Sequence, residues 1–339
     1  MNNTKSRALQ LPNTEEEDDE LNVQSQESKI LLNSLPRERG WLSDYIYLYK
    51  DFWVTSYVLT GIISFQKNFQ AKDTDIILVT FPKSGTTWLK ALVYSMVNRK
   101  IFSLDNTPLN ATNVHDLVPF LESNIYRNGQ NPGLSGIPSP RVFATHVPYP
   151  SLPESIKSTT CRIVYLCRNP FDNFISLWHF LMRARPKDLE PLSLEYCFDK
   201  FCTGACGFGP FWGHFLGFWN ESLKNPNKVL FLMYEDMKME NKLQMKRLAD
   251  FLGYPFSENE EKEGVIEEIS KFCSIESMRD LQPNNSGNKV LERFDVASFF
   301  RKGEVGDWMN HLTPSMADRL KKVVEEKLGG SGLNLKLFG

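Results

Sequence analysis

An apolar run followed by a loop of small polar residues constrains the fold of this chain most. Residues 76–81 are apolar apart from one threonine, a pattern typical of a strand buried on both faces of a parallel sheet. The loop at residues 82–87 reads Pro-Lys-Ser-Gly-Thr-Thr, and apolar residues then recur at helical spacing over residues 88–97. A strand, a polar loop and a helix in this order place a helix N-terminus at the carboxyl end of a strand, where it can bind an anion.

The same pattern recurs along the chain. Further buried strands are predicted over residues 142–145, 162–167 and 229–233. Alternating strands and helices predict an α/β fold, a single domain with a central parallel sheet flanked by helices. We expect one helix to begin at Pro170 and another to run from residue 234 to residue 252, where Gly253 ends it. Polar residues follow all four strands, at the edge where such sheets bind ligands: Lys83, His146, Arg168 and Tyr234.

Composition divides the chain of 339 residues into two parts. Residues 1–33 are polar and strongly acidic, which predicts a disordered tail, because they cannot bury enough apolar surface to fold. Residues 34–339 form the predicted domain. The formal net charge of −2 argues against a nucleic-acid or membrane partner, so any anion site must be local.

Targeting signals and cysteines predict the compartment. The first residues lack the apolar run of a signal peptide, and no stretch reaches the roughly 18 apolar residues of a membrane span, so we expect a cytoplasmic protein. The six cysteines include no C-x-x-C pair and are expected to be free thiols. A zinc site at Cys202, Cys206 and His214 is an alternative, but the spacing does not match a zinc motif, and we predict no metal.

The loop at residues 82–87 offers more hydrogen-bond donors than a helix cap needs, so we favour an anion site over an ordinary capped helix. A nucleotide triphosphate is one candidate anion, but in a Walker loop the lysine follows the second glycine, whereas Lys83 precedes Gly85. The strand at residues 162–167 is followed by Arg168 rather than by a metal-binding aspartate, and only Glu235 and Asp236 could replace one. A Mg²⁺-dependent P-loop phosphotransferase therefore stays as the alternative enzyme.

Four segments resemble the motifs of the cytosolic sulfotransferases that use 3′-phosphoadenosine 5′-phosphosulfate (PAPS). They are residues 80–88, residues 144–148, residues 168–172 with Ser176, and residues 301–308. Residues 115–122 resemble the plant members of the family. The resemblance implies a P-loop-NTPase-like sulfotransferase fold. It also implies an enzyme that moves the sulfuryl group of PAPS to a hydroxyl group of a small molecule and releases PAP.

The resemblance also implies a role for individual residues. His146 would be the general base, Lys83 would stabilise charge on the leaving oxygen, and Ser176 would restrain Lys83 when the donor is bound alone. The implied donor-binding residues are Lys83, Ser84, Gly85, Thr86, Thr87, Trp88, Arg168, Ser176, Tyr234, Ser274, Arg301, Lys302 and Gly303. Two positions depart from the family. Ala144 stands where mammalian relatives have a lysine, and Ile275 stands where an aromatic ring often contacts adenine.

The acceptor pocket is less well defined by the sequence. The candidates that could line it are Phe81, Phe180 and the Phe52-Trp53 pair, together with His146. The acceptor could be a flavonoid, a steroid, a hydroxylated hormone or a desulfo-glucosinolate. A non-catalytic binder of PAPS or PAP is a third reading, which the presence of Lys83, His146 and Ser176 disfavours.

The C-terminal region predicts the assembly. Mammalian cytosolic sulfotransferases pair through a K-x-x-x-T-V-x-x-x-E segment, and Met309, Thr313, Pro314 and Asp318 occupy the matching positions here. The lysine is lost, and proline cannot donate a backbone hydrogen bond. Thr313 and Pro314 instead predict the N-cap and first residue of a helix. We therefore expect a monomer.

Overall fold

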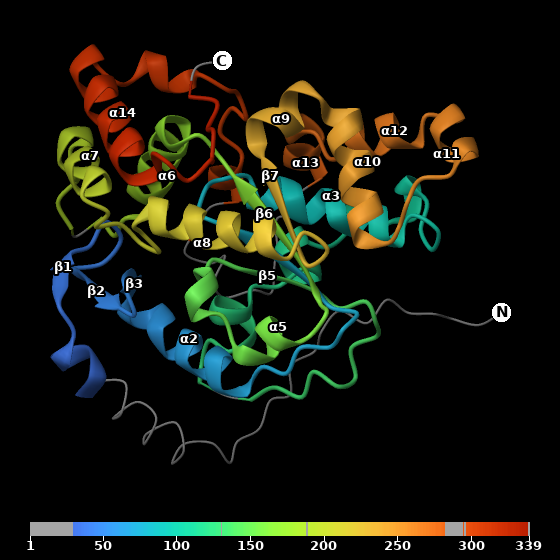
Figure 1. The fold of residues 1–339 in the computed structure, drawn as a ribbon, viewed down its shortest axis with the longest axis horizontal. Helices are drawn as coiled ribbons and strands as arrows, with labels where there is room; N and C mark the ends of the chain where they lie inside the picture. The colour runs from blue at the N-terminus through green and yellow to red at the C-terminus, as the bar shows by residue number, and fades with distance from the viewer. Residues whose placement is uncertain (1–29, 130, 188, 282–293, 295, 338–339) are drawn as a thin grey trace.

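The fold centres on a parallel sheet of four strands, seen in a computed structural model that describes residues 30–129, 131–187, 189–281, 294 and 296–337 (Figure 1). The strands lie in the order β5-β4-β6-β7, and every neighbouring pair is parallel. Their bounds are β4 Ile76–Thr80, β5 Val142–Thr145, β6 Arg162–Cys167 and β7 Val229–Met233. These bounds confirm the four predicted strands and the α/β fold class.

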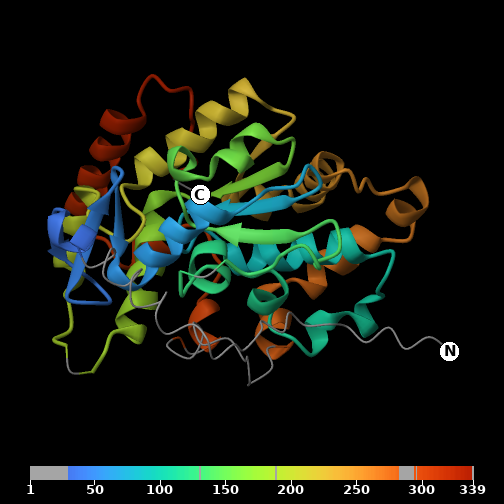
Figure 2. The same ribbon diagram turned by 90° about the horizontal axis from the view of Figure 1, so that it is seen from below.

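Each strand of this sheet is apolar on both faces, so helices cover both of them (Figures 1 and 2). Alternate residues point to opposite faces, so that Ile77 and Val79 lie in one hydrophobic cluster and Ile76 and Leu78 lie in the other. The first cluster packs on α2 (Ser56–Asn68), α5 (Glu154–Ser158), α6 (Pro170–Ala184), α7 (Leu194–Cys202), α8 (Phe211–Lys224) and α14 (Pro314–Leu328). The second packs on α3 (Thr86–Asn98), α4 (Val114–Leu117), α9 (Tyr234–Met239), α10 (Asn241–Leu252), α12 (Val265–Phe272) and α13 (Ile275–Leu281).

A small antiparallel sheet lies beside the first cluster and was not predicted. It consists of β1 (Arg37–Arg39), β2 (Tyr45–Tyr49) and β3 (Phe52–Thr55), in that order. Trp41 and Phe52 are buried in the first cluster, so these strands are part of the same domain as the parallel sheet. Within the described chain, the remaining elements are α11 (Glu258–Lys262) and the short turns η1 (Leu104–Asn106), η2 (Pro108–Asn110), η3 (Leu121–Ile125), η4 (Tyr149–Ser151), η6 (Val296–Phe299) and η7 (Asp307–Asn310).

The continuous helix expected over residues 234–252 is wrong. The backbone leaves the helical region at Glu240, with φ −122° and ψ 43°, and this residue separates α9 from α10. Gly253 does end α10 in the left-handed conformation, at φ +76°.

The predicted acidic tail lies almost wholly outside the described residues, which begin at residue 30, and residues 30–34 are helical. In the part of the chain that the structure describes, no helix has the length and apolarity needed to cross a membrane.

Candidate active site

A cavity of about 430 Å³ opens at the carboxyl edge of the parallel sheet. The polar residues that follow all four strands line it: Lys83, His146, Arg168 and Tyr234. Residues 301–303 close one end, and aromatic side chains from several elements line the other. The cavity therefore has a cationic end and an apolar end.

The loop between β4 and α3 forms the floor of the cationic end. Gly85 has φ +106°, and a Cβ atom there would approach Tyr234 Cδ2 to 2.9 Å, so only glycine fits without movement. Thr86 and Thr87 begin α3, have no side-chain cap on their helix, and line the cavity with Gly85. The backbone N–H groups of this first helical turn are available to an anion.

Ser84, one of the expected donor-binding residues, does not line the cavity. It is fully buried, its backbone N–H donates to the Phe81 carbonyl, and its hydroxyl accepts from Asn173 Nδ2 at 3.1 Å. These contacts hold the loop together from behind and keep Ser84 away from the cavity.

Lys83 projects into the cavity from a left-handed backbone conformation, with φ +67°. Its ammonium lies 3.9 Å from the centre of the Phe180 ring and 3.5 Å from the Ser298 carbonyl oxygen. Burial, together with the positive charges of Arg168 and Arg301, lowers the pKa of Lys83 to about 7. A negatively charged ligand would stabilise the protonated form.

Arg168 joins the two loops at the cationic end. Its guanidinium donates to the backbone carbonyls of Lys83 at 3.3 Å and Glu304 at 3.0 Å, and its Cζ lies 4.6 Å from the centre of the Tyr234 ring. Ser176, from α6, lines the cavity close by. The Nε atoms of Arg168 and Arg301 are buried and have no hydrogen-bond partner among the described residues. Unused buried donors of this kind suit an anionic ligand such as a phosphate.

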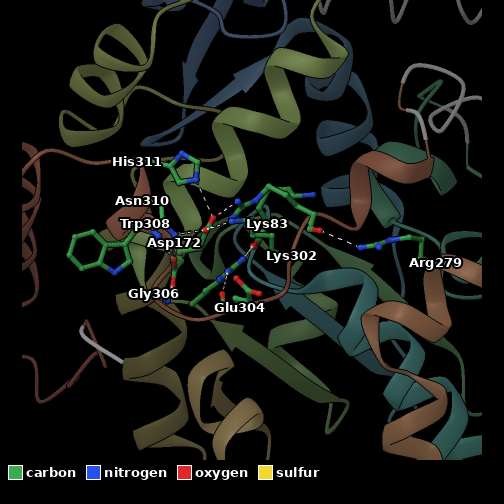
Figure 3. Close-up of polar contacts among 12 residues, drawn as sticks. Lys83, Asp172, Arg279, Lys302, Glu304, Gly306, Trp308, Asn310 and His311 are labelled. Atoms are coloured by element: carbon green, nitrogen blue, oxygen red, sulfur yellow. Dashed lines mark hydrogen bonds and ion pairs between the residues drawn. The ribbon is translucent and has the colours of Figure 1, made fainter.

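The C-terminal loop supplies two further cations (Figure 3). Arg301 and Lys302 both pair with Asp307, with a Lys302 Nζ–Asp307 Oδ1 distance of 2.6 Å. His311 Nε2 lies 3.2 Å from the same carboxylate, and Asn310 donates to it at 3.0 Å. Burial works against ionisation of Asp307, but the contacts from Lys302 and Arg301 outweigh it and hold the pKa of Asp307 below its usual range.

An aromatic pair borders the same end of the cavity. The rings of Trp88 and Tyr234 meet edge to face at 5.4 Å, and the Tyr234 hydroxyl donates to the Gly303 carbonyl at 2.9 Å. Gly303 has φ +69°, and a Cβ atom there would approach Ile275 Cδ1 to 2.5 Å. Ser274 and Ile275 also line this part of the cavity. These residues leave a space with one aromatic and one aliphatic wall.

His146 lies between the two ends and is held by three contacts. Its Nδ1 lies 2.7 Å from the Thr80 carbonyl oxygen, which can only accept, so Nδ1 carries the proton and Nε2 is the basic nitrogen. Its backbone N–H donates to Glu122 Oε1 at 2.8 Å, and its carbonyl accepts from His214 Nε2 at 2.8 Å. Burial lowers the pKa of His146 to about 3, so the ring is neutral at pH 7.

The apolar end is lined by rings from separate elements. Phe120 and Phe208 flank His146, with ring centres 4.7 and 5.3 Å away, and Phe180 faces the same space from α6. Other residues that line this end are Trp41, Leu42, Ile46, Val54, Tyr57, Val58, Leu177 and Leu181. Phe180 thus lies where an apolar ligand would contact it.

Phe81, Phe52 and Trp53 do not line the cavity, and the prediction that they would is corrected here. Phe81 is fully buried inside the first hydrophobic cluster, with its ring 5.5 Å from His214 and 6.1 Å from Phe215. Phe52 packs into the first hydrophobic cluster against Tyr49 and Phe208. Val54 and Thr55, the last two residues of β3, line the cavity instead.

Sequence reasoning missed four residues that organise this site: Glu122, His214, His115 and Lys90. His115 and Glu122 belong to the segment 115–122 that resembles the plant members of the family, but this resemblance assigns neither residue a role. Lys90 and His214 lie inside helices, and nothing in their spacing distinguishes them from surface residues. Among the described residues, no group of three His, Cys, Asp or Glu side chains is arranged to hold a metal ion.

Comparison with known proteins gives one consistent family. Residues 73–332 match the sulfotransferase domain. Cytosolic sulfotransferase 15 of Arabidopsis thaliana is 50% identical over 326 residues, which cover 95% of this chain and 90% of that protein. A solved Arabidopsis thaliana sulphotransferase is 41% identical with a TM-score of 0.74, covering 96% of this chain and all of that one. A mouse sulfotransferase solved with PAP is 28% identical with a TM-score of 0.66, covering 84% of this chain and 95% of that one.

Proposed function

Since the chain belongs to the sulfotransferase family, we propose that it transfers the sulfuryl group of PAPS to a hydroxyl group of an apolar small molecule, with His146 as the general base. One observation carries the proposal. The ring of His146, with Nδ1 bonded to the Thr80 carbonyl, lines the same cavity as Lys83 and the first turn of α3. A base and an anion site thus border one space.

The cationic end fits the two charged ends of the donor. The first turn of α3 with Thr86, Thr87 and Lys83 would bind the 5′-phosphosulfate. Arg168, Ser176, Arg301, Lys302 and Gly303 would bind the 3′-phosphate, while Trp88, Tyr234 and Ser274 would border adenine. The unused Nε atoms of the two arginines support this assignment, as does the mouse relative that binds PAP.

The chemistry follows from the proton positions. His146 Nε2 would take the proton of the acceptor hydroxyl as its oxygen forms a bond to sulfur. The bond from sulfur to the bridging phosphate oxygen then breaks, and that oxygen gains negative charge. Lys83 would stabilise this charge as a hydrogen-bonded cation, and Ser176 would limit its access to the oxygen before the acceptor binds.

The apolar end indicates the class of acceptor. Its walls are mainly aromatic and aliphatic, with Thr55, Ser123 and Asn124 as polar members of the lining, so a flat or fused-ring compound with one hydroxyl directed at His146 suits it, such as a flavonoid or a steroid. The sugar of a desulfo-glucosinolate would place several hydroxyl groups against these mainly apolar walls. We place the enzyme in the cytosol, as the name of the Arabidopsis relative does for that protein.

A Mg²⁺-dependent phosphotransferase is less well supported. Glu235, the nearest candidate metal ligand, is buried and accepts a hydrogen bond from the Asn169 backbone N–H at 2.9 Å. Asp236 pairs with Lys336, and neither carboxylate lines the cavity. We therefore propose that turnover needs no metal.

Thermal unfolding with ligands tests the proposal. PAP at 100 times its Kd should stabilise the native state by about 2.7 kcal/mol and raise Tm, and EDTA should leave this shift unchanged. PAPS with a panel of flavonoids, steroids and desulfo-glucosinolates should yield sulfated products from the first two classes. Strong stabilisation by ATP with Mg²⁺ and none by PAP would contradict the proposal, and PAP binding without any product would favour a non-catalytic binder.

A further inference from the structure

Two buried polar side chains beside the cationic end have no role in the chemistry described above. Lys90, in α3, is fully buried, and its Nζ lies 3.0 Å from His115 Nδ1. His115, in α4, is 3% exposed, lines the cavity, and places Nε2 3.2 Å from Thr87 Oγ1. A fully buried lysine is rare and costly unless it is paired, so its contact with His115 calls for an explanation.

The surroundings of Lys90 favour its charged form, although burial does not. Its Nζ lies 3.4 Å from the centre of the Phe120 ring, whose face attracts a cation. Burial lowers the pKa of Lys90 well below its usual value, and the nearby carboxyl groups of Glu122 and Asp116 offset this only in part. An ammonium group at this position can only donate hydrogen bonds.

The direction of each hydrogen bond then follows. Lys90 donates to Nδ1 of His115, so this nitrogen is unprotonated, and the single proton of the neutral ring lies on Nε2. Nε2 therefore donates to Thr87 Oγ1. Since that oxygen accepts from His115, its own O–H is left to donate into the cavity that Thr87 lines.

The ring of His115 is also fixed in orientation. Phe120 stacks on it with ring centres 5.6 Å apart and an interplanar angle of 17°, and Phe299 lies 4.8 Å away on a tilted plane. A ring held in this way cannot easily exchange its two nitrogens. The direction of the hydrogen-bond chain is thus built into the packing.

We infer that Lys90 and His115 form a buried relay that fixes the Thr87 hydroxyl as a hydrogen-bond donor to the 5′-phosphate of the nucleotide. The inference rests on the proposed function, because it requires the 5′-phosphate to lie at the first turn of α3. Both residues are positioning residues, since they act through Thr87. Hydrogen bonds in such a chain polarise one another, so loss of any member should weaken the contact at its end.

Calorimetric binding of three nucleotides tests the relay. His115→Phe and Thr87→Val should each weaken PAP and adenosine 5′-phosphate by about 3–10-fold, the range expected for one hydrogen bond. The double variant should bind no more weakly than either single variant, within about twofold. Adenosine 3′-phosphate lacks the group that Thr87 would contact, so its affinity should not change. The inference would be overturned if the two losses of affinity multiplied in the double variant, or if adenosine 3′-phosphate lost as much affinity as the other two nucleotides.

The ring nitrogens of His115 give a second test, whose main readout is taken on the wild-type protein. In the wild-type protein, ¹⁵N spectra of labelled histidine should show the Nε2–H form, and Lys90→Met should shift the signal toward the Nδ1–H form. His115→Gln should keep PAP affinity within about threefold, because the amide can accept from Lys90 and donate to Thr87. An Nδ1–H form in the wild type would refute the inference. Failure of the wild type to bind PAP at all would instead refute the proposed function.

Discussion

At the scale of single residues, His146, the proposed base, is held by contacts that are distant in sequence. Thr80 fixes its proton, Glu122 fixes its backbone nitrogen, and His214 fixes its carbonyl oxygen. These partners come from the end of β4, from η3 and from α8. The orientation of the basic nitrogen therefore depends on three elements that meet only in the folded protein.

Replacement of His146 separates catalysis from donor binding. His146→Ala should lower kcat by roughly 10²–10⁴-fold, the usual contribution of a general base. PAP affinity should stay within about twofold of wild type, because His146 faces the acceptor and makes no phosphate contact in our proposal. Steady-state kinetics and calorimetry measure the two quantities. Full turnover by the variant would remove His146 from the mechanism.

The pH dependence should reflect Lys83 rather than His146. The pKa of His146 is about 3, so its neutral form persists through the neutral range and adds no decline near pH 6.5. The pKa of Lys83 is about 7, so its charge is lost as the pH rises above this value. We predict that kcat/KM for PAPS falls about tenfold per pH unit above 7 and is level just below it.

The matched variant for this profile is Lys83→Arg, whose guanidinium stays charged at every pH of the assay. Its activity should be lower, but the alkaline decline should disappear. A wild-type profile that stays level to pH 9, or an unchanged decline in Lys83→Arg, would show that another group titrates.

The sequence could identify those site residues that belong to a recognisable motif. Lys83, His146, Arg168 and Tyr234 each follow a strand, and their strands predict where they meet. Phe81 follows a strand as well, yet it continues the alternation of Ile77 and Val79 and is fully buried in the first hydrophobic cluster. Whether a ring in this cluster also reaches the cavity depends on long-range packing, which a single sequence does not specify.

At the scale of elements, α6 organises the C-terminal loop through one buried carboxylate. Asp172 accepts hydrogen bonds from the backbone N–H groups of Gly306 at 2.7 Å and Trp308 at 3.0 Å (Figure 3). Arg301 and Lys302 lie just before these residues. The helix thus holds the loop that supplies two cations to the cavity.

Removal of this carboxylate should reduce both stability and donor affinity. Asp172→Ala leaves two buried N–H groups without their acceptor, so the free energy of unfolding should fall by about 2 kcal/mol or more. PAP should bind more weakly, although Asp172 does not line the cavity. Denaturant unfolding and calorimetry measure these effects.

Two variants serve as controls for this change. Asp172→Asn keeps one acceptor and should lie between Ala and wild type, while Asp318→Ala removes an exposed carboxylate of α14 and should change neither quantity. Wild-type stability in Asp172→Ala would contradict the role assigned to the Asp172 carboxylate.

Element boundaries show where local sequence rules stop. The run from residue 234 to residue 252 has helical spacing throughout, but Glu240 interrupts it. The three short strands before α2 escaped prediction because β1 has only three charged residues and the aromatic residues of β2 and β3 extend over only a few positions. In both cases, packing against the rest of the domain decides a conformation that the local pattern leaves open.

At the scale of the whole molecule, the cavity joins residues from Trp41 to Gly303, so it exists only when both sheets and the C-terminal loop are assembled. The β1–β3 sheet supplies walls to the apolar end, and residues 301–303 supply cations to the other. The two ends of the cavity thus receive residues from opposite ends of the chain, in addition to those from its middle. The four parallel strands and their buried character could be inferred from periodicity, whereas the order of the strands in the sheet and the shape of the apolar end depend on long-range packing.

We predict that the whole molecule is a monomer. The segment after residue 308 that pairs mammalian relatives is used here within the chain. Thr313 caps α14 by accepting from the Met316 backbone N–H at 3.3 Å, and Pro314 is its first residue. α14 buries Leu320, Val324 and Leu328 in the first hydrophobic cluster, against α7 and α8. At the positions of the lost ion pair, Met309 is 62% exposed, and Asp318 is an exposed carboxylate.

Light scattering at micromolar concentration should give the chain mass of 39.1 kDa. PAP should leave the mass unchanged, since the donor end lies within one chain. A mass twice that of the chain would contradict the prediction, and Met309→Lys with Asp318→Lys would then locate the interface. Like charges facing each other across a two-fold axis would dissociate a dimer built on this segment, whereas a dimer that survived them would have to use another surface.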